Sequence, residues 1–504
     1  MSFGASATTK GTNALASRYS MLGPAVLGNK SLYSYRGYQA LAVQNNDDTV
    51  NIGPSNGNYQ PALGTKVTFP LQKTSQIVGK CWVQIDLSPG TTANGFNPAL
   101  PWVTPGVGQN WPQAELVKNV GDLIVSNHVL VYGTTNLQYI PGLFHAVKRR
   151  IACNDVNIEG TNAMVLGNLP PSGRTVALAA GTADPASQSS TEAVLINAFY
   201  QGVRLYVPCE EYFWTKNKDE NHMTEAYALD LQIQLQLANL GDFVNTSSRD
   251  ISVIVTRPTI SNILLRYEEI TVSAAEKQNK LALYATPEGQ VQHFQDLELV
   301  TQQFIAGTGA RAPGTALSAQ PALTQLIDLS GLRMDIICLY VLVSRWTNTR
   351  PATDLPLENG TLSTGFAGSP MESNSSIPSL LFEGSATQTA GFSTAIPVVQ
   401  FQQFAGTVAL DAAPIEDFWN RAMMRKKYFP DAQVGDFIYI RSPALFPVDA
   451  KNATGHLSPA TTGNMKLGIT VNNPGAGITY IVNIFSNAHN LMQSRTGGLG
   501  KALL

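Results

Sequence analysis

Apolar and polar residues alternate along much of the chain. The clearest stretch is residues 229–237, where leucine and isoleucine at every second position are separated by Asp230 and three glutamines. A period of two predicts a strand with one buried face. The same alternation occurs at residues 67–71, 83–87 and 467–471, with Gly, Pro, Asn or Ser near the ends. Short strands separated by turn residues predict an all-β chain built of sandwiches or barrels.

The order of predicted elements in the first half is repeated in the second, which indicates an internal duplication. In the first half, a strand at residues 123–131 precedes a short helix at 143–150 and a strand at 203–207. In the second half, a strand at 407–410 precedes a helix at 416–428 and a strand at 436–441. Both predicted helices end in three basic residues, namely Lys148, Arg149 and Arg150, and Arg425, Lys426 and Lys427.

The length of 504 residues favours two domains, because one hydrophobic core rarely organises so long a chain. We expect a flexible Gly- and Ala-rich arm at residues 1–28, a first barrel at 29–256 and a second barrel at 257–504. Each barrel carries one long loop, at about 154–201 in the first and 347–394 in the second. Such loops usually lie on the surface.

Charge is scarce and balanced in this sequence. Only 13% of the residues are charged, and the net charge is -2. Nucleic-acid binding needs clustered Lys and Arg, so we expect no direct contact with nucleic acid. The basic ends of the two predicted helices are explained by the helix dipole and solvation, with a partner-binding patch as the alternative.

No catalytic motif is present in the sequence. It contains no H-E-x-x-H, no G-x-S-x-G, no Walker phosphate loop and no kinase motifs. The six histidines show no i, i+4 pairing, and the adjacent pairs Glu210–Glu211 and Glu268–Glu269 would point to opposite faces of a strand. We therefore predict no catalytic residue, no metal site, no cofactor and no enzyme activity.

The cysteines and the candidate glycosylation sequons are best explained without a chemical role. The cysteines lie far apart without a C-x-x-C pair, so we expect packed, reduced thiols at Cys81, Cys153, Cys209 and Cys338. The sequence holds five candidate N-glycosylation sequons, which begin at Asn29, Asn245, Asn359, Asn374 and Asn452. Because this triplet is common by chance in Ser- and Thr-rich sequence, unmodified asparagines are the favoured interpretation. The first thirty residues lack the apolar stretch of a secretory signal, and we expect the protein in soluble compartments.

Several segments resemble the major capsid proteins of nucleocytoplasmic large DNA viruses, such as iridoviruses, phycodnaviruses and African swine fever virus. In the first half these are residues 64–69 (GTKVTF), 77–87 (IVGKCWVQIDL), 120–124 (VGDLI), 131–133 (VYG), 205–208 (LYVP), 212–214 (YFW) and 228–235 (ALDLQIQL). In the second half they are Ile263, Leu264, Leu265 and Tyr267, which resemble the strand opening the second barrel, and residues 437–440, 446–447, 454–456 and 497–499. Residues 33–38 and 457–459 depart from the family pattern, so the resemblance assigns no subfamily.

The resemblance implies two tandem eight-stranded antiparallel jelly rolls in each chain, with short helices and long surface loops. It further implies a homotrimer of nearly hexagonal outline that tiles an icosahedral shell and is assembled in the host cytoplasm. The implied partners are other copies of the chain, neighbouring capsomers, minor capsid and penton proteins, and proteins of an internal membrane. The long loops would lie outside the shell and the amino-terminal arm inside it.

One alternative from another functional class remains open. Jelly rolls and β-sandwiches also occur in carbohydrate-binding proteins and glycoside-active enzymes, and a fold alone does not establish a function. That alternative predicts a concave site lined by aromatic and acidic side chains.

Overall fold

The computed structural model describes a set of segments along the chain. These are residues 40–43, 50–71, 77–100, 110, 112–117, 119–151, 165–166, 191–209, 230–246, 253–272, 274–286, 290–308, 322–329, 331–332, 334–347, 398–410, 415–416, 428, 438–445, 447, 455–458, 464–471, 473, 478–495 and 498–502. The expected arm at residues 1–28 lies outside them, as do most of the loop at 154–201 and all of the loop at 347–394 except Thr347. No helix within the described residues is long and apolar enough to cross a membrane.

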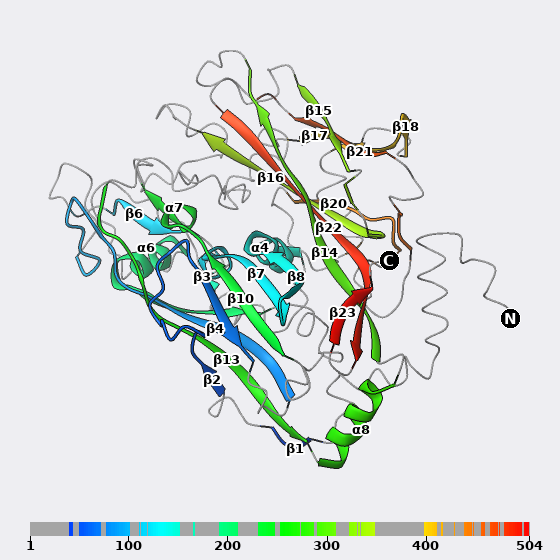
Figure 1. Ribbon diagram of the computed structural model, residues 1–504. Coiled ribbons are helices and arrows are strands. Elements are labelled where there is room, and N and C mark those ends of the chain that lie inside the picture. Colours follow the sequence, from blue (N-terminus) through cyan, green and yellow to red (C-terminus); the bar gives the residue numbers. More distant parts are fainter. Residues whose placement is uncertain are drawn as a thin grey trace.

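The described strands form two groups that follow each other along the chain (Figure 1). The first group, unit 1, contains β1 (Ala40–Val43), β2 (Val50–Ile52), β3 (Lys66–Pro70), β4 (Ile77–Leu87), β5 (Thr91–Thr92), β6 (Ala114–Leu116), β7 (Val125–Tyr132), β8 (Thr135–Pro141), β9 (Val203–Pro208), β10 (Leu231–Leu237), β11 (Val244–Thr246), β12 (Ile254–Thr256) and β13 (Ile260–Val272). The second, unit 2, contains β14 (Gln290–Ala306), β15 (Leu323–Asp328), β16 (Ile336–Thr347), β17 (Val398–Ala405), β18 (Val408–Ala409), β19 (Ile415–Glu416), β20 (Ile438–Arg441), β21 (Met465–Val471), β22 (Ile478–Arg495) and β23 (Gly498–Ala502).

The sheet topology confirms the duplication. Unit 1 has sheet 1a, in the order β1-β13-β4-β9, and sheet 1b, in the order β3-β10-β7-β8; unit 2 has sheet 2a, β14-β22-β16-β20, and sheet 2b, β15-β21-β17-β18. The eight strands of these two sheets can be numbered 1 to 8 along the chain within each unit. The order across the sheet is then 1-8-3-6 in sheets 1a and 2a, and 2-7-4-5 in sheets 1b and 2b. All pairings among the described strands are antiparallel, as in a jelly roll. Strand β10, the clearest strand of the sequence, alternates buried and half-buried side chains as predicted.

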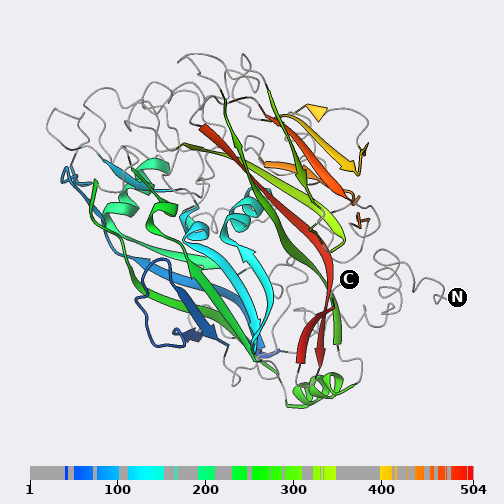
Figure 2. The same cartoon turned by 45° about the horizontal axis from the view of Figure 1, so that its top comes forward.

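Each unit encloses its own hydrophobic core between two sheets, whose strands can be followed in Figure 2. In unit 1, Val83 and Ile85 of sheet 1a pack in one cluster with Phe69 and Ile233 of sheet 1b, and all four side chains are fully buried. In unit 2, the corresponding cluster joins residues of sheet 2a with residues of sheet 2b, namely Leu339, Val341, Val482 and Ile484 with Phe401, Leu467, Ile469 and Val471. Two facing sheets around one core are the double-layer arrangement in which alternating strands bury one face.

Short helices connect the strands. They are α3 (Val120–Leu123), α4 (Gly142–Ile151), α6 (Thr191–Gln201), α7 (Leu240–Phe243) and α8 (Ala274–Tyr284). Helix α4 confirms the helix predicted at 143–150. Two predictions are wrong at their boundaries: Leu123 ends helix α3 instead of opening a strand, and the segment 154–201 ends in α6, whose Leu195, Ile196 and Phe199 are buried in the core.

Two further predictions fail in detail. Glu416 does not begin a helix, because it lies in β19 and pairs with Gln400 of β17; of the helix predicted over 416–428, the described part holds only Tyr428 in helical conformation. The segment with Ile263, Leu264, Leu265 and Tyr267 does not open the second barrel. Strand β13 pairs with β4, β1 and β2 and therefore completes sheet 1a, so unit 1 extends beyond residue 256.

Candidate functional site

The described residues offer no cluster suited to metal or nucleophilic chemistry. Among them, no group of three or more His, Cys, Asp and Glu residues could hold a metal ion. Cys81, Cys209 and Cys338 are buried thiols, and Cys153 lies outside the described residues. Burial raises the pKa of the Cys338 thiol to about 12, so this sulfur stays protonated and poorly nucleophilic near neutral pH.

Two of the six histidines lie together, which their spacing in the sequence does not indicate. The rings of His128 on β7 and His145 on α4 meet edge to face at 4.5 Å between centroids, and both side chains are buried. His456 lies 3.4 Å from the Asp335 carboxylate. Burial lowers the pKa of His456, although the Asp335 charge opposes this shift. These histidines are thus packed within the units, as expected for structural residues.

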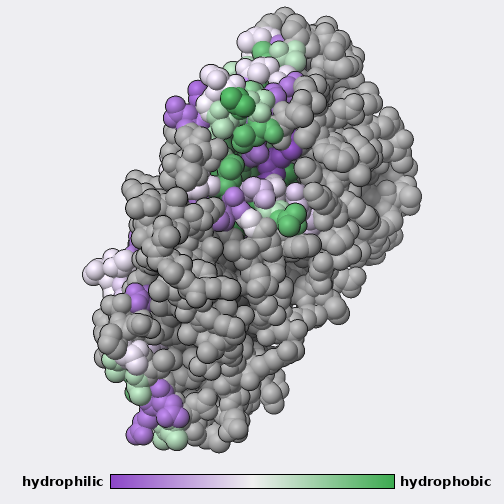
Figure 3. All heavy atoms as spheres, turned by 90° about the vertical axis from the view of Figure 1, so that its right-hand side faces the viewer, coloured by the Kyte–Doolittle hydropathy of each residue, from purple (hydrophilic) through white to green (hydrophobic). Residues whose placement is uncertain are grey.

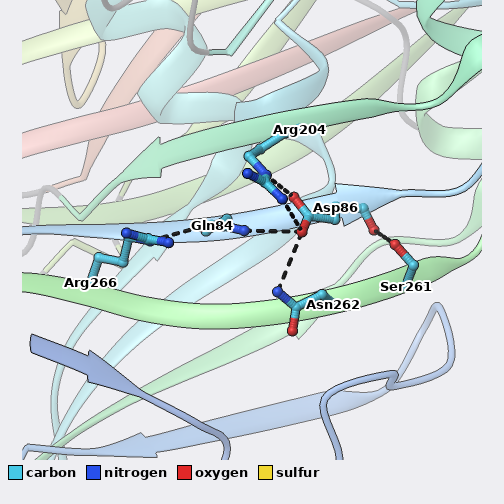
Figure 4. Close-up of polar contacts among 6 residues, drawn as sticks. All are labelled: Gln84, Asp86, Arg204, Ser261, Asn262 and Arg266. Atoms are coloured by element: carbon cyan, nitrogen blue, oxygen red, sulfur yellow. Dashed lines mark hydrogen bonds and ion pairs between the residues drawn. The ribbon is translucent and has the colours of Figure 1, made fainter.

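A polar network crosses the outer face of sheet 1a (Figure 4). The Arg204 guanidinium on β9 donates two hydrogen bonds to the Asp86 carboxylate on β4, from Nε at 2.7 Å and from Nη2 at 3.2 Å. Gln84 and Asn262 also donate to Asp86, at 3.0 and 3.3 Å, and Arg266 donates to the Gln84 side-chain oxygen at 2.7 Å. Burial raises the pKa of Asp86, but the three donors outweigh it and the net pKa is lowered.

The same face also carries large apolar side chains. Across β13, β4 and β9, the cross-strand rows are Arg266–Trp82–Pro208, Leu264–Gln84–Tyr206 and Asn262–Asp86–Arg204. Trp82, Tyr206 and Leu264 are half-buried, whereas the Arg204 side chain is 57% exposed. Tryptophan, tyrosine and arginine are the residues most enriched at the energetic centres of protein interfaces. The outer face of sheet 1a therefore has the composition of an assembly surface.

A third hydrophobic cluster joins the two units. Helix α4 of unit 1 places Phe144 and Val147 against the outer face of sheet 2a, where they meet Tyr340 and Phe485. The Phe144 ring lies 5.7 Å from the Tyr340 ring and 5.3 Å from the Phe485 ring, measured between centroids. The views in Figures 1 and 2 agree in placing α4 between the strands of unit 1 and sheet 2a.

Exposed apolar side chains lie on the opposite side of unit 2, at the two edges of sheet 2b. Leu326 of β15 is 52% exposed, Val408 of β18 is 65% exposed and Leu410, next to β18, is 45% exposed. Figure 3 looks onto the side of the molecule that carries sheet 2b and shows hydrophobic residues gathered there among hydrophilic ones. Gly468 lies on β21, between β15 and β17. A Cβ atom at this position would lie only 3.0 Å from the Phe404 ring, so the absence of a side chain leaves room for that ring.

The remaining residues singled out in the sequence are scattered. Asn245 lies on strand β11, whereas Asn29, Asn359, Asn374 and Asn452 lie outside the described residues. Glu268 and Glu269 are consecutive on β13, and Glu210 and Glu211 lie outside the described residues. The basic residues at the end of α4 are helical, as predicted, but their side chains are not described.

No protein-family model and no curated protein matches the sequence. Among solved structures, the chain is similar to PBCV-1 VP54 fitted into a reconstruction of the virophage Sputnik, with a TM-score of 0.57 and 11% identity over 92% of this chain and 97% of that chain. It is also similar to the Faustovirus major capsid protein, with a TM-score of 0.56 and 10% identity over 89% of this chain and 90% of that chain.

The chain has the double jelly-roll fold of these capsid proteins. A third structure, the quasi-atomic model of the PBCV-1 virus capsid, matches at a TM-score of 0.57 with 10% identity, over 92% of this chain and 97% of that chain. The similarity thus spans both jelly rolls and nearly the full length of each matched chain, although few residues are identical. It confirms the fold class expected from the sequence.

Proposed function

We propose that this chain is the major capsid protein of a large icosahedral double-stranded DNA virus and has no enzyme activity. The observation that carries the proposal is the duplicated jelly roll, which the chain shares over about 90% of its length with the PBCV-1 and Faustovirus capsid proteins. Two similar barrels in one chain give three chains six similar barrels. Three copies in a closed ring can therefore fill a nearly hexagonal outline, and such units tile a shell.

We propose that unit 1 comprises residues 29–272 and unit 2 about 290–504, with α8 in the connection and residues 1–28 as an arm. The shift of the boundary from 256 to 272 is supported by the pairing of β13 with β4. The proposed partners are further copies of the chain, neighbouring capsomers, and minor capsid, penton and internal-membrane proteins. Nucleic acid is not among them, because the net charge is only -2. Assembly would take place in the host cytoplasm, and the mature protein would reside in the virion.

Mass photometry of the purified chain tests this proposal. A homotrimer has a mass of about 162 kDa, three times the 54.1 kDa of one chain. The alternative of a carbohydrate-binding protein or glycoside-active enzyme predicts a 54.1 kDa monomer whose thermal midpoint rises when oligosaccharides are added. A monomer at micromolar concentration that is stabilised by a sugar would replace the capsid proposal with this alternative.

A further inference from the structure

Two cysteines of unit 1 lie directly opposite each other in sheet 1a. Strands β4 and β9 pair Trp82 with Pro208, so the next position of the register sets Cys81 against Cys209. The Cys209 amide donates a hydrogen bond to the Cys81 carbonyl oxygen at 3.0 Å, which continues the ladder to this pair. Both side chains belong to the core of unit 1, with 3% and 2% of their surface exposed. The two thiols therefore share the inner face of the sheet.

The register brings the two residues within the span of a disulfide bond. Opposite residues joined by backbone hydrogen bonds in an antiparallel ladder have Cα atoms about 5.5 Å apart. In disulfide-bonded cysteines the Cα atoms are most often about 5.5–6 Å apart. The Cβ atoms of opposite residues lie about 4.5–5.5 Å apart, whereas a disulfide favours about 3.5–4.5 Å. A small approach of the two strands thus permits the bond, and the strain that this approach leaves makes the bond easier to reduce.

The position of Cys209 favours access by an oxidant. Strand β9 is the last strand in the order of sheet 1a, and Cys209 directly follows its final residue, Pro208. The end of a strand at the edge of a sheet opens more readily than its centre. Cys338 has no such opposite cysteine, because it lies on β16 across from Asn487 of β22. Of the three cysteines that the structure describes, only Cys81 and Cys209 are placed to bond with each other.

We propose that Cys81 and Cys209 form a disulfide bond when the protein passes from a reducing to an oxidising environment. The thiolate of one cysteine attacks a small disulfide such as oxidised glutathione, which forms a mixed disulfide and releases one glutathione thiol. The thiolate of the other cysteine then attacks the sulfur of the first and releases the second glutathione. The two cysteines lose two electrons and two protons, and oxidised glutathione is reduced to two thiols.

The bond closes a long loop of unit 1. The loop of about 130 residues between the two cysteines includes strands β5 to β8 and helix α4, which packs against sheet 2a. A cross-link over so long a segment restricts the unfolded chain and thereby stabilises the folded unit. This role rests on the proposed function, in which a capsid subunit is made in the reducing cytoplasm and later meets the oxidising medium outside the cell. The disulfide then acts as a lock that closes in the released particle.

Mass spectrometry of the purified full-length chain tests the bond directly. The protein is equilibrated with reduced or with oxidised glutathione, the remaining thiols are alkylated in urea, and the peptides are mapped without reduction. In oxidised glutathione, the expected product is one linked pair of peptides that contain Cys81 and Cys209, with Cys338 alkylated. In reduced glutathione, all three cysteines should be alkylated. Two alkylated thiols in oxidised glutathione, or a link from either cysteine to Cys153 instead, would overturn the proposal.

The thermal midpoint of unfolding tests the stabilising role. The midpoint of the wild-type protein should be about 5–10 °C higher in oxidised than in reduced glutathione. Cys209→Ala should abolish this difference, whereas the matched control Cys338→Ala, at another buried cysteine, should keep it. Each variant is compared with itself in the two conditions, so the packing loss of the substitution cancels. Cys81→Ala replaces Cys209→Ala if the latter lacks the wild-type circular dichroism spectrum. A wild-type protein without the difference, or a Cys209→Ala variant that keeps it, would contradict the lock.

The disulfide and the proposed function can fail separately. Mass photometry in both glutathione conditions gives the oligomeric state next to the peptide map. Linked peptides from a chain that stays monomeric would overturn the proposed function and leave the bond standing. Trimers whose Cys81 and Cys209 stay reduced in oxidised glutathione would overturn the bond and leave the proposed function standing.

Discussion

Replacing Phe144 by alanine should weaken the contact between the two units. Phe144 is half-buried and makes two aromatic contacts, with Tyr340 at 5.7 Å and with Phe485 at 5.3 Å. Each aromatic pair contributes about 0.5–1.5 kcal/mol beyond its buried area, and truncation of a fully buried Phe costs about 3–5 kcal/mol. Because Phe144 is partly exposed, we expect Phe144→Ala to lower the free energy of unfolding by about 2–3 kcal/mol.

Urea denaturation followed by circular dichroism measures this loss, with every variant at the same protein concentration because self-association also stabilises the fold. Phe144→Leu keeps most of the apolar volume and should lose only about 1 kcal/mol. The control Leu100→Ala, at a side chain that is 50% exposed, should change stability by less than about 0.5 kcal/mol. If Phe144→Ala is no more destabilising than Leu100→Ala, the contact through α4 does not hold the two units together.

Three other predictions concern packing and titration inside the units. Gly142→Ala should destabilise by about 3 kcal/mol, since its Cβ would lie 2.0 and 2.3 Å from two backbone carbonyl oxygens, whereas Gly331→Ala meets nothing within 4 Å and should be neutral in thermal denaturation. Because the pKa of His456 is lowered below 6.5 in the fold, the unfolded chain binds its proton more tightly, and stability should fall as the pH drops below about 6.5; His456→Gln should flatten the urea midpoint against pH, and an unchanged slope would contradict this. The Cys338 side chain is buried and its pKa is about 12, so the thiol should react with a thiol reagent only in urea. Labelled Cys338 in the native protein, detected by mass spectrometry, would contradict this prediction.

The alternating pattern was sufficient to predict the strands with one buried face. The sequence of β10 specifies both its conformation and its buried side, because leucine and isoleucine at every second position leave one face for the core. The expectation of two tandem jelly rolls was correct, although the strand predicted at 407–410 is β18 and therefore corresponds to β8 and not to β7. Helix α6 was missed although its buried Leu195, Ile196, Phe199 and Tyr200 follow helical spacing, because the Gly-, Ala- and Ser-rich segment before it favoured a loop.

The partners of each strand were harder to predict. The apolar residues of β13 indicate a buried strand, but they carry no information on whether it closes the first barrel or opens the second, and that depends on its register with β4. The group of aromatic and polar side chains on the outer face of sheet 1a was missed for a similar reason. Trp82, Tyr206 and Arg266 are far apart in the sequence and share a face only when β4, β9 and β13 pair. Sequence distance likewise hides the contact of Phe144 with Phe485.

Electron microscopy of the purified chain tests the central claim most directly. Six barrels in a ring, with sheets packed at about 10 Å plus side chains and loops, predict particles about 70 to 90 Å wide with a nearly hexagonal outline and three-fold symmetry. Class averages of that shape, with six similar densities around a centre, are the expected result. Monomers with two densities and no preferred association at micromolar concentration would contradict the account of this chain as a capsid subunit.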